Sequence, residues 1–253
     1  MDFRVRHFLL EWISRKLIGC FCFACTIYVS KNEHRLYPRT SYSNSELYDR
    51  NVIRSTKRIS NPGCYATSTQ LLIAPLVNYL KPEAPPTVFG VSGYSGAGTI
   101  VHRDVLGKSV TKAKVTPELL RNAVKPYSIT GHIHEREASY HLSSLLPDAQ
   151  VKVGFIPVVG PWFSGILSTA SIPLKEKLTA KDVVSLFEEK YADEKLIRIQ
   201  KGIIEIKDVQ GNHDWRVGGF QMSEDGGRVV VVVGFGSIIR CFSDAFYPSG
   251  RAR

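Results

Sequence analysis

A single cysteine, Cys64, stands where a thiol could act as a nucleophile. It follows an Asn-Pro-Gly turn and precedes a run typical of a helix, in the stretch ISNPGCYATSTQLL at residues 59–72. The first N–H groups of a helix are unpaired and positively polarised, which stabilises a thiolate and lowers its pKa. We therefore expect an exposed nucleophile at Cys64, with the same N–H groups available to a developing oxyanion. A buried, inert cysteine at a helix start is the alternative.

Two histidines and a glutamate in the stretch GHIHEREASYH are candidates for proton transfer. A thiolate nucleophile needs an acid or base beside it, and His134 oriented by Glu137 would serve. On a strand His132 and His134 would share a face, whereas a helix beginning at His134 would place Glu137 one turn further on. A nearby carboxylate is expected to raise the imidazole pKa. Two alternatives stay open: a His-x-His metal site completed by His102 or Glu135, and an exposed polar helix start.

A glycine-rich stretch, SGYSGAGT at residues 92–99, follows an expected strand. Its flexible backbone suits close contact with a phosphate or a cofactor at Ser92, Gly93, Ser95 and Gly96, and an ordinary loop fits the pattern equally well. A second stretch, VVVVVGFGSII, imitates a dinucleotide fingerprint. It lacks the third glycine, and only 14 residues follow it, too few for the roughly 30 of a βαβ unit. We exclude a nucleotide-binding fold there.

The elements that must position these residues alternate irregularly. Helices are expected over residues 65–80, with a bend at Pro75, and from the Thr179 cap to about Tyr191. Thr116, followed by proline and glutamate, predicts a further helix start. Expected strands cover residues 57–60, 87–92, 151–158, 165–174 and 228–233. The last is a continuous valine run suited to the interior of a sheet. Without a regular βαβ alternation, the pattern predicts the α+β fold class.

Composition and charge indicate a globular protein with a basic head. The chain has 253 residues, is 43% hydrophobic and 22% charged, and carries a net charge of +10. Residues 1–60 hold 11 of the 33 Lys and Arg but only 5 of the 23 Asp and Glu. No nucleic-acid motif accompanies this excess, so we expect a targeting or poorly ordered head rather than a nucleic-acid surface.

The five cysteines predict neither a disulfide framework nor a metal centre. Their odd number and irregular spacing indicate free thiols in a reducing compartment. Cys20, Cys22 and Cys25 lie in an apolar run, residues 17–29, that is shorter than the roughly 20 residues of a membrane-spanning helix. No second group of ligands completes a metal motif there, so a short buried or interfacial segment is expected.

Five motifs together resemble the N-acetyl-gamma-glutamyl-phosphate reductase family. They are ISNPGCYATSTQLLIAPLV, VSGYSGAGT, HIHEREASYHLS, FIPVVGPWFSGILST and WRVGGFQ, and they match in order and spacing. The resemblance implies NADPH-dependent reduction of N-acetyl-L-glutamyl 5-phosphate to the 5-semialdehyde in arginine biosynthesis. It implies Cys64 as the nucleophile that forms a thioester and His134 as the acid or base. His132 and Glu137 would be companions of that histidine, and Ser92 to Gly98 would lie near the substrate phosphate and the nicotinamide.

The resemblance also implies a fold, partners and a location. The expected fold is the catalytic and dimerisation domain of the semialdehyde-dehydrogenase (glyceraldehyde-phosphate-dehydrogenase-like) type, with a mixed or antiparallel sheet and helices on one face. A small-molecule acyl phosphate is the expected ligand and a second copy, paired through the sheet, the expected partner. Neither nucleic acid nor metal is expected. The likeness to fungal members implies the mitochondrial matrix.

The two ends of the chain depart from the family pattern. We expect a basic, atypical segment at 1–51, the catalytic and dimerisation domain at 52–234, and a divergent tail at 235–253. The first segment has one glycine, Gly19, where the family has a glycine-rich nucleotide-binding turn, so most of a Rossmann half would be missing. We therefore expect weak NADPH binding or none, and very low turnover. Ser164 stands where many bacterial members have a basic residue, and an asparagine expected near the nicotinamide is absent.

Two other functions stay compatible with these residues. One is a cysteine hydrolase or thiol acyltransferase that uses Cys64 and His134 without a redox step. The other is a non-catalytic dimerisation module. Fast alkylation of Cys64 near neutral pH would favour an enzyme over a module, and phosphate-dependent acylation by the semialdehyde with NADP would favour a reductase over a hydrolase.

Overall fold

The computed structural model describes residues 41–42, 44, 46–55, 59–60, 62–97, 99–103, 109–146 and 149–236. Residues 1–40, with three of the five cysteines, and residues 237–253, with Cys241, lie outside these residues. Asn61 of the cysteine turn, Gly98 of the glycine-rich stretch and residues 57–58 of the first expected strand also lie outside them.

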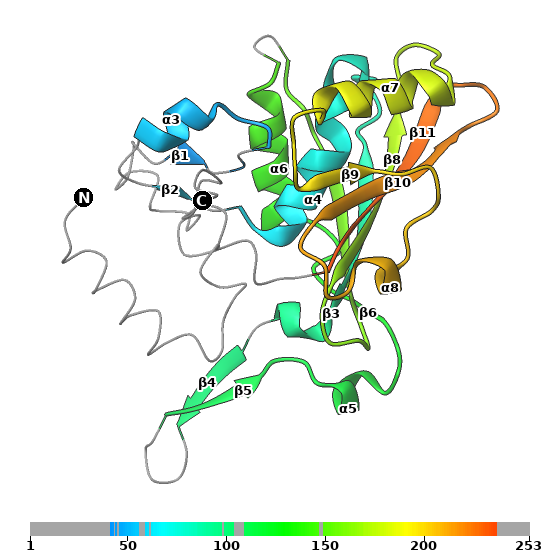
Figure 1. Ribbon diagram of the computed structural model, residues 1–253. Helices are drawn as coiled ribbons and strands as arrows, with labels where there is room; N and C mark the ends of the chain where they lie inside the picture. The colour runs from blue at the N-terminus through cyan, green and yellow to red at the C-terminus, as the bar shows by residue number, and fades with distance from the viewer. Residues whose placement is uncertain are drawn as a thin grey trace, which may run out of the picture.

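A seven-stranded mixed sheet forms the centre of the molecule (Figure 1). Its strands are β3 (Thr87–Gly93), β6 (Lys125–Pro126), β7 (Gly154–Gly160), β8 (Ile166–Pro173), β9 (Ile197–Ile199), β10 (Trp215–Met222) and β11 (Arg228–Phe235). They are ordered β6-β7-β3-β8-β11-β10-β9, with the β3/β7 and β9/β10 pairs parallel and the other pairs antiparallel. The expected α+β class is confirmed, and the valine run is the interior strand β11.

Three helices, α4 (Cys64–Ile73), α6 (Ile133–Ser143) and α7 (Ala180–Lys190), pack on one face of this sheet (Figure 1). All ten residues of α4 are buried, because this helix contacts α6 as well as β8 and β11. The side chains along each strand point alternately to the two faces of the sheet. On β3, Val88 is buried whereas Phe89 is 45% exposed on the opposite face. The sheet therefore has a helix-covered face and a more open face.

The helix over the cysteine turn is shorter than expected. Helix α4 ends at Ile73 and continues as a 3-10 helix, η3 (Ala74–Tyr79), instead of one α-helix to residue 80. Pro75 has no N–H to donate and its ring crowds the preceding turn, so the helix changes pitch there. Helix α7 follows its prediction, since Thr179 and Asp182 form a capping box at its start.

Smaller elements surround this body. They are β1 (Ser41–Tyr42), α3 (Arg50–Ser55), β2 (Ile59–Ser60), η4 (Tyr94–Ala97), β4 (Thr99–Arg103), β5 (Ser109–Ala113), α5 (Pro117–Leu120) and α8 (Ile206–Val209). Strands β4 and β5 form a separate antiparallel ribbon that projects from the body in Figure 1. Thr116 caps α5 as predicted, by accepting the Leu119 N–H. An ion pair of 2.6 Å between Arg50 and Glu194 connects α3 to the loop after α7.

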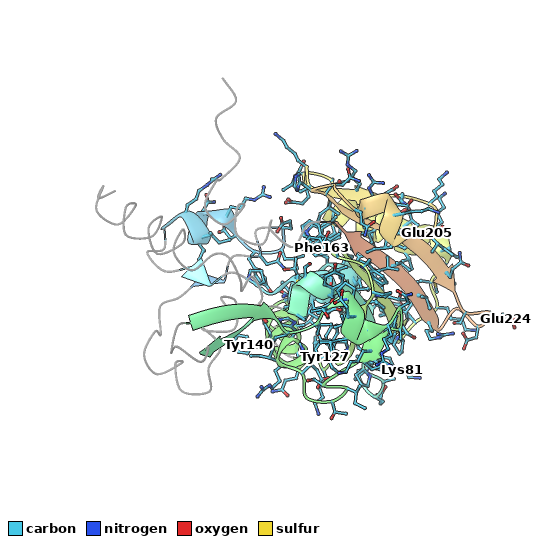
Figure 2. All side chains as sticks on the ribbon, turned by 90° about the horizontal axis from the view of Figure 1, so that it is seen from below. Lys81, Tyr127, Tyr140, Phe163, Glu205 and Glu224 are labelled. Carbon is cyan, nitrogen blue, oxygen red and sulfur yellow. The ribbon has the colours of Figure 1, made fainter. Side chains whose placement is uncertain are left out.

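The main core lies between the helices and the sheet, where side chains from both layers fill the space (Figure 2). Its largest fully buried members include Leu71, Leu72, Phe155, Phe187 and Phe235. Burial of such side chains contributes roughly 1.5–3 kcal/mol each, which holds the helices at fixed positions over the strands. Within the part of the chain described, no helix has both the length and the apolar character needed to cross a membrane.

Candidate active site

Cys64 is the first residue of α4, so the helix start predicted from the Asn-Pro-Gly turn is confirmed. Gly63 is the N-cap, in an extended conformation, and its carbonyl accepts the Thr67 N–H at 2.8 Å. The N–H groups that precede Thr67 form the positively polarised end of α4, in the turn that begins with Cys64. The cysteine is only 5% exposed, so the expectation of an exposed thiol is wrong. The reason is that α4 is buried between α6 and the sheet.

His134 lies directly against the cysteine turn. It is in the first turn of α6, is 5% exposed, and reaches the turn because α6 packs beside α4 (Figure 1). A Cβ added to Gly63 would be 2.3 Å from His134 Nε2 and 2.9 Å from Cε1, so the imidazole fills the space that a side chain there would need. Because consecutive Cα atoms are about 3.8 Å apart, this contact also brings the ring close to Cys64.

His132 is the N-cap of α6, so the helical conformation is the one present, beginning one residue earlier than considered, at Ile133. Its Nδ1 accepts the His134 N–H at 3.2 Å, which requires an unprotonated Nδ1 and places the proton of the neutral ring on Nε2. Burial lowers the pKa of His132, which favours this neutral form. The two imidazole rings lie 4.9 Å apart between centroids. His132 therefore fixes the start of the helix that carries His134.

Glu137 lies one turn beyond His134, with its Oε2 4.0 Å from Nε2. The expected rise in the imidazole pKa is nevertheless wrong. Burial, with a smaller contribution from His132, lowers the pKa of His134 to about 3. The cost of placing a charged ring out of water outweighs the attraction of the carboxylate at this distance. His134 is neutral near pH 7 and able to accept a proton, and its Nδ1 has no hydrogen-bond partner among the described residues.

Two candidate metal ligands make other contacts. His132 Nδ1 is engaged in capping α6, and the Glu135 carboxylate accepts the Phe155 N–H at 3.2 Å. The side chain of His102 lies outside the described residues. Within the described ranges, no group of three or more His, Cys, Asp or Glu residues is arranged to hold a metal ion. The chemistry that this arrangement would allow is proton transfer by the imidazole that packs against the cysteine turn.

The glycine-rich stretch forms the end of β3 and the 3-10 turn η4. Three consecutive N–H groups, of Gly93, Tyr94 and Ser95, donate to the carbonyls of residues 165, 162 and 163 at 2.8, 2.9 and 3.0 Å. A Cβ on Gly93 would lie 2.6 Å from the carbonyl oxygen of Phe163, so this glycine allows two loops to pack closely. These three N–H groups are not free to cradle a phosphate. Contact of Ser92, Gly93, Ser95 and Gly96 with a cofactor stays a prediction.

The sequence analysis missed Tyr65, which fixes the cysteine turn on the sheet. Its hydroxyl lies 3.1 Å from the carbonyl oxygen of Gly90 and 3.0 Å from that of Val158, and it donates to this pair. A Cβ on Gly90 would be 2.5 Å from the Tyr65 ring, so the ring lies directly on the strand at that glycine. The isolated glycine inside the expected strand 87–92 was the available signal, because such glycines mark close approach of another group.

A thiol at a helix N-terminus with a neutral imidazole beside it can form and release a covalent acyl intermediate. The fold is thus an α+β domain whose candidate site combines a buried cysteine at a helix start with a histidine packed against the same turn. Residues 64–235 match the family described as "Semialdehyde dehydrogenase, dimerisation domain". The chain belongs to this family, and the expected fold type is confirmed.

Fungal and bacterial relatives agree with the resemblance drawn from the five motifs. The chain is 39% identical over 208 residues to "Protein arg11, mitochondrial" of Schizosaccharomyces pombe, covering 82% of this chain and 21% of the relative. It is 40% identical over 208 residues to "Protein arg-6, mitochondrial" of Neurospora crassa, with 82% and 22% covered. It is 39% identical over 208 residues to the N-acetyl-gamma-glutamyl-phosphate reductase of Xanthomonas euvesicatoria, with 82% and 60% covered. The chain thus spans about a fifth of these fungal relatives and three fifths of the bacterial one.

Solved structures support the fold. Aspartate semialdehyde dehydrogenase II from Vibrio cholerae superposes with a TM-score of 0.59 at 14% identity, over 83% of this chain and 66% of that one. The enzyme from Francisella tularensis gives the same TM-score and identity over 81% and 68%. At this level of identity the match concerns the fold alone.

Proposed function

We propose that this chain carries the acylation and reduction chemistry of an N-acetyl-gamma-glutamyl-phosphate reductase, which converts N-acetyl-L-glutamyl 5-phosphate to the 5-semialdehyde in arginine biosynthesis. The observation that carries the proposal is the position of His134, whose ring fills the space over Gly63 next to Cys64. A neutral imidazole at a thiol on a helix N-terminus suits acyl transfer. The fungal and bacterial relatives named above supply the substrate class.

The first half of the reaction needs only the residues of this site. Neutral His134 accepts the proton of the Cys64 thiol, and the sulfur attacks the carbonyl carbon of the acyl phosphate. Phosphate leaves with the electron pair of the broken C–O bond, and a thioester remains on Cys64. The polarised N-terminus of α4 stabilises the oxyanion that develops during attack. Burial lowers the pKa of His134 to about 3, so the ring is unprotonated throughout the neutral range, and the imidazolium that forms on proton transfer depends on stabilisation by the Glu137 carboxylate, 4.0 Å from Nε2.

The second half needs a hydride donor, and we propose NADPH, which supplies that hydride to the thioester carbon when it is bound. The resulting thiohemiacetal collapses to the aldehyde as its hydroxyl proton is lost and the sulfur leaves. We expect His134 to exchange that proton. Ser95 and Gly96, in the half-exposed turn η4 after β3, are the residues that we propose to lie near the nicotinamide. The backbone of Phe163 fills the space where a Gly93 side chain would lie, and the Gly93 N–H donates to the carbonyl of Gly165. The phosphates of the cofactor therefore need contacts elsewhere.

The open face of the sheet is proposed to pair with a second copy of the chain. Phe89 on β3 is 45% exposed on the face opposite α4, and its strand neighbours Ile156 and Thr169 are half-buried. An apolar strip in the middle of a sheet face is typical of an interface. The family description as a dimerisation domain supports this partner. Pairing would leave the helix-covered face, with Cys64 and His134, outside the interface.

The location is proposed to be the mitochondrial matrix. Two fungal relatives at 39% and 40% identity are named as mitochondrial proteins. Their names do not say which part of the mitochondrion holds them. The reducing matrix suits a cysteine that is not in a disulfide, as Cys64 is. Fractionation of mitochondria with protease protection of the matrix proteins tests this assignment.

The acylation step gives a direct test of the proposed function. Purified protein is incubated with N-acetylglutamyl phosphate in the absence of NADPH, and the intact mass and peptide masses are measured. A thioester adduct on the peptide containing Cys64 is expected, together with release of one phosphate. The Cys64→Ser variant should show no adduct at that peptide. Addition of NADPH should discharge the adduct as aldehyde. Turnover to the free acid without NADPH would instead identify a hydrolase, and absence of any adduct would overturn the proposal.

A further inference from the structure

Three side chains on one face of α6 accept hydrogen bonds from backbone N–H groups of β7 and of the residues just before it. The three bonds run from Phe155 N–H to Glu135 Oε2 (3.2 Å), from Val153 N–H to Ser139 Oγ (3.1 Å) and from Val151 N–H to Ser143 Oγ (2.9 Å). The acceptors are spaced four residues apart along the helix, and the donors two apart along the extended chain. We call this set the α6–β7 ladder.

The spacing of the ladder follows from the geometry of the two elements. Four helical residues rise about 6 Å, and two extended residues rise about 6.6 Å, so each step along the helix matches a step along the strand. Ser139 and Ser143 also donate to the carbonyls of residues 135 and 139 on their own helix, which orients both hydroxyls. The ladder therefore fixes the axial position of α6 against β7 at three points.

The ladder completes the part of this edge that β6 leaves uncovered among the described residues. Gly154 N–H donates to the carbonyl of Pro86, the residue just before β3, so the alternate N–H groups of β7 face the other way. Pro157 has no N–H, and Val159 is paired with Lys125 of the short strand β6. Buried strand N–H groups need partners, and the side chains of α6 supply them at the uncovered residues. The expected start of this strand at residue 151 is wrong: the N–H groups of Val151 and Val153 bond side chains of α6, and β7 begins at Gly154.

The first bond of the ladder lies next to the proposed base. Glu135 follows His134 directly, and its carboxylate holds the N–H of Phe155. The Phe155 ring lies 4.9 Å from the Tyr65 ring and 5.4 Å from that of His132, so this bond joins the strand, the cysteine turn and the helix cap. A helix that slid by a fraction of a turn would carry the His134 ring out of the space over Gly63.

We propose that Glu135 is a positioning residue, which sets the place of α6 on β7 and so holds the His134 imidazole over Gly63, beside Cys64. The proposal rests on the proposed function, because it assigns Glu135 a role through His134. Glu135 itself does not contact the reacting atoms. Glutamine at this position keeps an acceptor oxygen, whereas alanine removes it, so the two substitutions separate the hydrogen bond from the space it occupies.

The experiment compares Glu135→Ala, Glu135→Gln and Arg136→Ala, an exposed neighbour on the same turn that serves as the matched control. Imidazole signals of His134 in the labelled full chain are titrated by NMR, and urea unfolding is measured in parallel. In Glu135→Ala the ring gains water, so its titration midpoint should rise by about one unit or more, and kcat in the reductase assay should fall about tenfold or more. In Glu135→Gln the His134 titration midpoint and kcat should stay closer to those of the parent protein than in Glu135→Ala. Arg136→Ala should change neither the midpoint nor kcat.

The outcomes separate this proposal from the proposed function. If Glu135→Ala lowers the free energy of unfolding but leaves the His134 titration unchanged, Glu135 is only structural and the proposal is overturned. If Glu135→Gln behaves like Glu135→Ala, the hydrogen bond is not the cause and the proposal also fails. If the parent protein shows neither Cys64 acylation nor turnover, the proposed function fails while the NMR comparison still decides the position of His134.

Discussion

The imidazole of His134 occupies the space where any side chain at Gly63 would lie. The distance from an added Cβ to Nε2 would be 2.3 Å, shorter than real Cβ contacts allow. The turn that contains Cys64 and the helix that contains His134 are therefore in close contact through one glycine. Gly63 is in an extended conformation that other residues adopt, with φ −67 and ψ 152, so close contact and not backbone strain demands glycine here.

Gly63→Ala should move His134 or the cysteine turn, because one of them must give way. We expect kcat to fall about a hundredfold, as for a displacement of about 1 Å in an active site, and the free energy of unfolding to fall by about 1–3 kcal/mol, as for overpacking. Gly202→Ala is the matched control, since a Cβ there meets nothing within 4 Å. Reductase assays and urea unfolding measure both effects, and parent-like kinetics in Gly63→Ala would contradict the described contact.

Tyr65→Phe should loosen the cysteine turn from the sheet. The substitution removes the hydroxyl that donates to the Gly90 and Val158 carbonyls and leaves them buried without this partner. A loss of about 1–3 kcal/mol in the free energy of unfolding is expected. The exposed Tyr140→Phe serves as the control, with a change within about 0.5 kcal/mol. Equal stability of the two variants would show that the Tyr65 hydroxyl contributes no net stabilisation.

Stability should fall as the pH is lowered below about 6.5, the ordinary pKa of histidine. Burial lowers the pKa of His134 to about 3 and that of His141 to about 4 in the folded chain. Between these values and 6.5 the unfolded chain binds more protons, so acid favours unfolding. The contribution of His134 is complete above pH 6.5 and is lost as the pH falls towards 3, at about 1.4 kcal/mol per pH unit within that window.

His134→Gln removes one of the imidazoles that the unfolded chain protonates below pH 6.5. The decrease in unfolding free energy between pH 6 and pH 5 should therefore be smaller in this variant by about 1 kcal/mol. Urea titrations at the two pH values measure it, with the exposed His213→Gln as the control. An unchanged pH dependence in His134→Gln would mean that this imidazole is hydrated in solution.

Phe89→Glu should break the proposed dimer. The change puts a charge into the apolar strip on the open face of the sheet, where pairing would remove it from water without a partner. Sedimentation analysis should show a dimer for the parent chain and a monomer for the variant at the same concentration. Leu119→Glu, at a 70% exposed position on α5, controls for added charge. A parent chain that sediments as a monomer, or an unaffected Phe89→Glu dimer, would place the interface elsewhere.

Several helix starts and one strand could be predicted from short stretches of sequence. Thr116 and Thr179 cap helices as predicted, because capping depends on residues within one turn. The valine strand and the helix start at Cys64 follow from hydrophobic pattern and turn chemistry for the same reason. The end of α4 at Ile73 was misjudged, although Pro75 gave a local signal of the change in pitch.

What the sequence determined by itself is the set of reactive groups and their places on elements: a cysteine at a helix start and a histidine pair with a glutamate one turn on. Only the tertiary structure decided that Cys64 is buried, that His134 has a lowered pKa, and that the N–H groups of Gly93 to Ser95 are already bonded. It also revealed Tyr65 and the α6–β7 ladder. The physical reason is that desolvation and hydrogen-bond pairing depend on neighbours from distant parts of the chain, which no local spacing specifies.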